Sequence, residues 1–155
     1  MSGDKKLPVS LQLVGLTAAV VFCFSTIGAF NLARALWLHS DTIAALEVSN
    51  QIQLYAPLVI FVVVCVASLF TFIALLFYSV RSAALISLSY LVLLLLFVVV
   101  QLVSTFMAYL SLPMPQQTLI VWVVVRLVYA AWLIGLLVKV WPNYSVKWTA
   151  AASTR

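Results

Sequence analysis

The stretch LIVWVVVRLVYAAWLIGLL, residues 119 to 137, contains a single charged residue, Arg126. A helix needs about 20 apolar residues to cross a hydrocarbon core about 30 Å thick, and this run is close to that length. A charge within such a run is costly unless it finds a partner or reaches the membrane surface. The stretch therefore predicts a transmembrane helix, and it raises the question of what its one charge does.

The whole chain shares this apolar character. Of its 155 residues, 66% are hydrophobic and 7% are charged, whereas a soluble domain carries about 25% charged residues. So few charges cannot cover an apolar surface in water, and we expect the chain to be dissolved in a lipid bilayer as one domain, residues 1–155. The eight Lys and Arg are spread thinly along the sequence, so no nucleic-acid partner is expected.

Four segments are long and apolar enough to span a bilayer. They cover residues 9–32, 56–78, 83–110 and 118–140. Runs such as LVLLLLFVVV do not alternate as the strands of a membrane β-barrel do. The predicted fold class is therefore all-α, an integral membrane bundle of four transmembrane helices. The first span follows Lys5 and Lys6 as a signal peptide would, but its apolar core is longer than the usual 7 to ~15 residues.

The segments between and after these spans are expected to lie outside the hydrocarbon. The loop 33–55 is predicted to carry a short surface helix that begins at Ser40 or Asp41. Its apolar side would hold Ile43, Leu46 and Ile52. Pro57 is expected in the first turn of the second span, and residues 141–155 form a tail.

The distribution of basic residues predicts the orientation, because Lys and Arg gather on the cytoplasmic side. Four spans place both termini on one side of the membrane. Among the basic residues near the ends of the spans, only Arg34 falls on the opposite side. The terminal side holds Lys5, Lys6, Arg81, Lys139, Lys147 and Arg155. Both termini are therefore predicted to be cytoplasmic, with the loop 33–55 outside.

Arg126 lies about eight residues inside the fourth span, or ~12 Å deep at 1.5 Å per residue. The antiparallel third span brings Gln101 to a similar depth. We expect a polar cluster in the outer half of the bundle, made of Asn31, Gln101, Ser104 and Arg126, with Asp41 or Glu47 as counter-ion. Three roles remain open for Arg126: holding helices together, handling a solute or ion, and recognising a partner. Its head can also reach outward to the lipid headgroups.

Small residues four apart allow helix backbones to approach closely in lipid. Gly15 and Ala19 form such a pair in the first span, and Ala131 and Gly135 form another in the fourth. Contacts within the bundle and contacts between copies explain this spacing equally well.

Several kinds of chemistry lack the residues they need. His39 is the only histidine, so neither a haem nor another metal site is expected, and no cofactor is predicted. Cys23 and Cys65 both fall in apolar runs, where a thiol behaves as a small hydrophobe. No acid lies within a span, and no nucleophile is paired with a base. We therefore do not expect an enzyme.

The C-terminal stretch VRLVYAAWLIGLLVKVWPNYSVKWT resembles the last helix and tail of an uncharacterised bacterial four-helix inner-membrane family, domain of unknown function 2569. Arg126, Trp132 and the segment 146–149 match its Arg, Trp and closing motif, while Ser145 stands where that family has Arg. The resemblance implies a multi-pass location in the bacterial inner membrane and no known activity.

The leading functional hypothesis is a non-catalytic accessory or interaction subunit that contacts the lipid bilayer and other integral membrane proteins, or further copies of itself. The alternative is a small oligomeric transporter or channel for an anion or small solute that uses Arg126 and Gln101. An immunity-type membrane protein is a further alternative.

Overall fold

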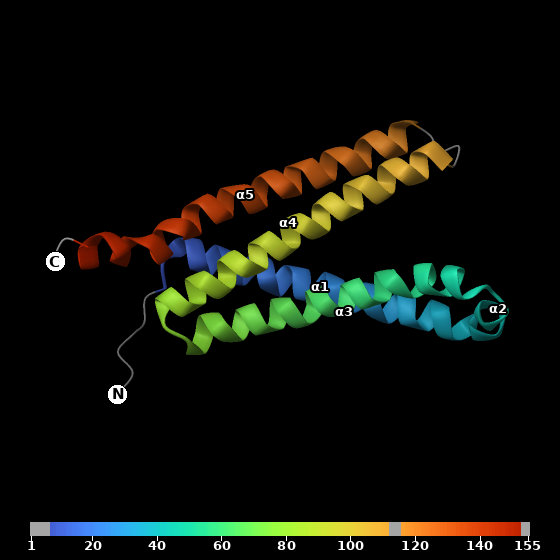
Figure 1. The fold of residues 1–155 in the computed structure, drawn as a ribbon, viewed down its shortest axis with the longest axis horizontal. Coiled ribbons are helices and arrows are strands. Elements are labelled where there is room, and N and C mark those ends of the chain that lie inside the picture. The colour runs from blue at the N-terminus through green and yellow to red at the C-terminus, as the bar shows by residue number, and fades with distance from the viewer. Residues whose placement is uncertain (1–6, 112–115, 153–155) are drawn as a thin grey trace. The chain divides into compact units, whose positions relative to one another are not determined.

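The computed structural model describes residues 7–111 and 116–152, with the side chains of residues 7–107 and 119–144. This part of the chain is helical and contains no strand. Its elements are α1 (Val9–Leu38), α2 (Ser40–Ala44), α3 (Val48–Phe77), α4 (Val80–Ser111) and α5 (Gln116–Ala152) (Figure 1). The predicted all-α fold class is confirmed.

Four of these helices contain stretches long and apolar enough to cross a membrane. The stretches are Val9–Leu38, Val48–Phe77, Val80–Met107 and Leu119–Tyr144. Each overlaps one of the four predicted spans, so the number and order of the spans agree with the sequence analysis. Helices of this length and composition are those of a multi-pass membrane protein.

The second span begins earlier than predicted. Hydropathy placed its start at residue 56, whereas α3 begins at Val48, because helical hydrogen bonds continue through the polar segment that precedes the apolar run. Pro57 consequently lies inside α3 and not in its first turn. A proline there has no N–H to donate to the carbonyl of Gln53.

The loop between α1 and α3 contains the predicted surface helix, α2, but not its predicted cap. The N-cap residue is His39, which makes no side-chain capping hydrogen bond, so the assignment of Ser40 or Asp41 was wrong. The backbone N–H of Ile43 instead donates to the carbonyl of His39 at 2.9 Å. Ile43 is buried, whereas Leu46 and Ile52 are exposed, and Ile52 belongs to α3.

The segment after residue 140, predicted as a tail, continues α5 as far as Ala152. Pro142 lies within this helix. The C-terminal part is therefore an extension of the last span, at least as far as the described residues reach.

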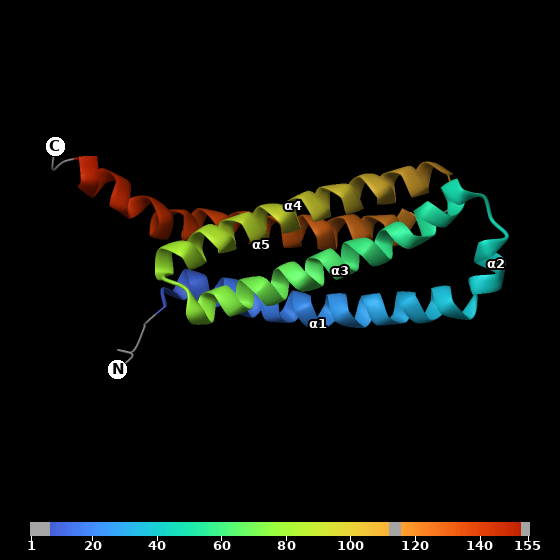
Figure 2. The same cartoon turned by 60° about the horizontal axis from the view of Figure 1, so that its bottom comes forward.

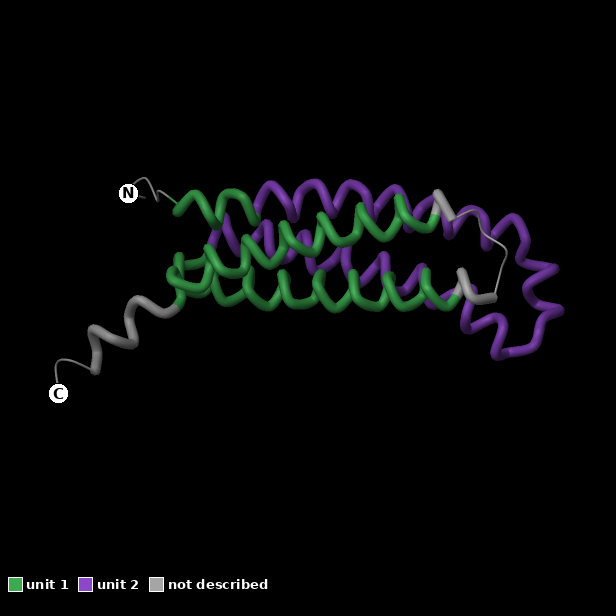
Figure 3. The backbone as a smooth tube through the Cα atoms, turned by 90° about the horizontal axis from the view of Figure 1, so that it is seen from above, with its two compact units in different colours: residues 1–14, 78–155 green, residues 15–77 purple. Residues whose placement is uncertain are grey.

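The chain divides into two compact units, residues 1–14 with 78–155 (unit 1) and residues 15–77 (unit 2) (Figure 3). In unit 2, α1 and α3 run antiparallel, with α2 at the turn between them (Figure 2). A Cβ on Gly28 would lie 2.9 Å from Cε1 of Phe61, and a Cβ on Gly15 would lie 3.2 Å from Cδ1 of Leu75. Side chains of α3 therefore pack directly against the backbone of α1 at both glycines.

Unit 1 is built on the antiparallel pair α4 and α5. Ser79 precedes α4, and its hydroxyl accepts the backbone N–H of Ser82 at 3.3 Å. The guanidinium of Arg81 lies 5.8 Å from the ring centroid of Tyr144. Asn143 donates from Nδ2 to the hydroxyl of Ser10 at 2.8 Å. The start of α1, the start of α4 and residues 143–144 of α5 therefore lie at one end of this unit.

Candidate functional site

The side chain of Arg126 joins α5 to α4 through three hydrogen-bond acceptors. One terminal nitrogen donates to the backbone carbonyl of Gln101 at 2.9 Å and to the hydroxyl of Thr105. The other donates to Oε1 of Gln101 at 3.0 Å. Both Arg126 and Gln101 are half-buried. The expected meeting of guanidinium and glutamine is thus present in the geometry of unit 1.

Thr105 was not among the predicted cluster residues, although it lies one turn after Gln101. Its hydroxyl donates to the carbonyl of Gln101 at 2.8 Å, which leaves its lone pairs free to accept from Arg126. Ser104, which was predicted, is exposed and lies one residue away from this face. The signal that could have found Thr105 is its spacing of four residues from Gln101, which places both on one side of a helix.

Trp122 completes the surroundings of the guanidinium. It lies one turn before Arg126 on α5, and its ring centroid is 5.6 Å from the guanidinium carbon. A cation over an aromatic face gains about 0.5–1 kcal/mol when exposed and about 2 kcal/mol when desolvated. The indole therefore contributes to holding the charge in a fixed place.

The charge of Arg126 is not neutralised by any of these partners. The two carbonyl groups, the hydroxyl and the indole are all uncharged. From Tyr78 to Arg155 the sequence contains no Asp or Glu, so this part of unit 1 offers no carboxylate. The arrangement can hold two helices together, and it retains a full positive charge.

The remaining members of the predicted cluster lie in unit 2. Asn31 is exposed on α1, and the predicted counter-ions are also exposed, Asp41 within α2 and Glu47 between α2 and α3. Their participation with Arg126 stays a prediction.

The four predicted packing residues fall into two groups. Gly15 lies at the contact between α1 and α3, and Ala19 lines a groove beside it. Ala131 and Gly135 are exposed on α5, and a Cβ built on Gly135 would meet nothing within 4 Å. At about 100° per residue these two lie roughly 140–180° around the helix from Arg126. They form an open face on the opposite side of α5.

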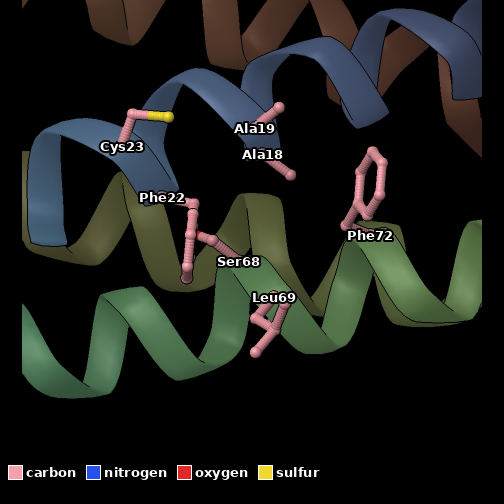
Figure 4. A pocket seen from close by; sticks show the side chains of 7 residues that line it. All are labelled: Ala18, Ala19, Phe22, Cys23, Ser68, Leu69 and Phe72. Atoms are coloured by element: carbon pink, nitrogen blue, oxygen red, sulfur yellow. The ribbon is translucent and has the colours of Figure 1, made fainter.

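The groove in unit 2 has a volume of about 220 Å³ and lies between α1 and α3 (Figure 4). Apart from the thiol of Cys23 and the hydroxyl of Ser68 its lining is hydrocarbon, from Ala18, Ala19, Phe22, Leu69 and Phe72. The Ser68 hydroxyl donates to the carbonyl of Val64 at 2.7 Å. Such a groove suits an acyl chain or an apolar side chain. Among the described residues no three His, Cys, Asp or Glu are grouped to hold a metal ion.

Comparison with known proteins gives no relative. No family model matches the chain, and no curated protein and no solved structure matches it. The resemblance of the C-terminal stretch to domain of unknown function 2569 therefore stays an expectation.

Proposed function

We propose that this protein is a non-catalytic subunit of a membrane assembly that acts by docking its transmembrane helices against other integral membrane proteins. We place it in a bacterial inner membrane, as the family resemblance implies, with both termini in the cytoplasm, as the distribution of basic residues predicts. The contact between Ser10 and Asn143 supports the placement of both termini on one side, since it joins the start of α1 to the last part of α5.

The observation that carries the proposal is the open face of α5 around Ala131 and Gly135. A glycine within a helix costs about 1 kcal/mol relative to alanine, and no neighbour in the described part of the chain uses the space that Gly135 leaves. In membranes, small residues are enriched where two helices approach closely. We therefore expect a helix of another chain to pack against the space beside Gly135.

The hydroxyl groups of the spans give a second line of support. Five of them donate to backbone carbonyls four residues earlier in their own helices, which satisfies them locally, whereas the buried hydroxyl of Ser87 has no hydrogen-bond partner among the described residues. The pairs are Thr26 with Phe22, Ser68 with Val64, Thr71 with Ala67, Ser89 with Leu85 and Thr105 with Gln101. Hydroxyls occupied in this way favour a packed bundle over a hydrated solute path.

The test is purification of the protein from native membranes in mild detergent, comparing two variants that each place a leucine at an exposed helix position. Gly135→Leu fills the open face, and Ala35→Leu fills an exposed position on α1. We expect partner proteins to be retained by the wild type and by Ala35→Leu, and to be lost from Gly135→Leu. Isolation of this chain alone at every expression level would contradict the proposal.

A second candidate function is a small oligomeric transporter or channel for an anion or small solute, with Arg126 and Gln101 lining its path. The observation that favours it is the uncompensated charge of Arg126 among neutral acceptors. In a background without Cys23 and Cys65, it predicts that cysteines at Gln101 and Tyr129 react with water-soluble thiol reagents. Unreactive cysteines at both positions would exclude a hydrated path there.

A further inference from the structure

The guanidinium of Arg126 points toward the end of the apolar spans at which α4 ends and α5 begins. Trp122 lies one turn nearer that end on α5, and Thr105 lies one turn nearer it on α4; the guanidinium contacts both. Helical side chains lean toward the N-terminus of their helix, which for α5 is the same direction. The charged head is therefore closer to the membrane boundary than its own backbone is.

The position of the charge can be estimated from the spans. The spans expected from sequence end at residue 110, five residues beyond Thr105, and begin at residue 118, four residues before Trp122. At 1.5 Å per residue these intervals are ~6–8 Å. The headgroup region adds ~5–8 Å on each side of the hydrocarbon core. The guanidinium therefore lies ~6–8 Å inside the hydrocarbon boundary, a depth at which local thinning of the bilayer can bring a lipid phosphate to it.

The guanidinium of Arg126 favours an anionic partner whose oxygen atoms match its donors. The acceptors that Arg126 reaches among the described residues are neutral, and a charge within hydrocarbon is costly unless it is paired or reaches the interface. A guanidinium presents its donors in a planar fork that matches phosphate oxygens, and such charge-assisted bonds are stronger than neutral ones. A phosphate diester is a partner that meets both the charge and the geometry.

A lipid molecule can reach Arg126 from within the bilayer. Trp122 is 54% exposed and Val125, beside Arg126, is also 54% exposed. On α4, Phe106 is 59% exposed at the level of Thr105. These side chains offer an apolar surface on which acyl chains can lie beside the guanidinium.

We propose that Arg126, supported by Thr105, Gln101 and Trp122, binds the phosphate group of a glycerophospholipid in the leaflet where α5 begins. The lipid supplies the negative charge that α4 and α5 lack, and its acyl chains cover the exposed residues beside the site. This site is independent of the partner docking proposed for the opposite face of α5.

The test is native mass spectrometry of the full-length protein titrated with phosphatidylglycerol or with a phosphate-free galactosyl diacylglycerol of identical acyl chains. We expect the wild type to retain the phospholipid roughly tenfold more tightly, the effect of about one charge-assisted contact. Arg126→Gln should abolish this preference. Lys139→Gln removes an exposed charge from the same helix and should preserve it.

Thermal unfolding of each variant shows whether it is folded. Should Arg126→Gln not fold, Arg126→Lys keeps the charge without the fork and should show a reduced preference. The comparison of headgroups on the wild type requires no variant. Equal retention of both lipids by the wild type would overturn the proposal, as would an equal loss in Lys139→Gln. Displacement of the phospholipid by millimolar inorganic phosphate would also overturn it, in favour of a soluble anion.

Discussion

Replacing Gly28 and Gly135 separately by alanine tests how closely α1 and α3 approach. In a helix interior, glycine to alanine stabilises by about 1 kcal/mol where the methyl group is accommodated. At Gly135 the methyl group meets nothing within 4 Å, so the full gain of about 1 kcal/mol is expected. At Gly28 it would lie 2.9 Å from Cε1 and 3.1 Å from Cζ of Phe61.

Carbon atoms prefer separations of about 3.5–4.0 Å, so the Phe61 ring must move or the helices must separate. Overpacking costs about 1–3 kcal/mol, which outweighs or cancels the helix gain. Gly28→Ala is therefore expected to change stability by between about 0 and 2 kcal/mol in the unfavourable direction. Gly15→Ala should fall between the two variants, because its neighbour is the flexible end of Leu75 at 3.2 Å.

The assay is reversible unfolding in mixed micelles, followed by circular dichroism, on the purified full-length chain. Phe61→Leu combined with Gly28→Ala should recover the gain, since the ring that obstructs the methyl group is then absent. If Gly28→Ala stabilises as much as Gly135→Ala does, the close approach of α1 to Phe61 is refuted.

Three further predictions address unit 1 and the orientation. A double-mutant cycle of Arg126→Leu and Gln101→Leu should give a coupling energy of about 0.6 to 1.7 kcal/mol in unfolding experiments, and strict additivity would show that their hydrogen bond contributes nothing. Reporter fusions at either terminus should behave as cytoplasmic, and a terminus on the outer face would contradict the proposed orientation. Cysteines at positions 10 and 143, in a background without other cysteines, should be joined by a short bifunctional thiol reagent, because Ser10 and Asn143 are in contact; failure would separate the start of α1 from α5.

The number and order of the spans could be predicted from sequence because burial in hydrocarbon imposes a minimum apolar length that is visible residue by residue. The ends of the helices could not be predicted in this way. α3 continues through polar residues back to Val48 and passes Pro57 within its interior, since hydrogen bonding and not hydropathy decides where a helix stops. Hydropathy therefore predicted the apolar spans but not the residues at which the helices begin and end.

The candidate site could be predicted only in part. Similar depth in antiparallel helices was enough to pair Arg126 with Gln101, whereas the choice of Thr105 over Ser104 depends on the rotation of α4 about its axis. That rotation is set by packing, and the spacing of four residues between Gln101 and Thr105 was its signal in the sequence. The close approach at Gly28 was missed for a related reason, since it depends on the identity of the residue opposite, Phe61.

The length of α3 has a consequence for the end of unit 2 that carries α2. Its 30 residues extend about 45 Å at 1.5 Å per residue, against a hydrocarbon core of about 30 Å. Even a tilt of about 40°, the upper end of the usual range, leaves part of the helix above the hydrocarbon. The protruding turns carry Asn50, Gln51 and Gln53, so α3 holds α2 outside the hydrocarbon, at the level of the headgroups. The exposed polar side chains of α2 can therefore contact headgroups and water.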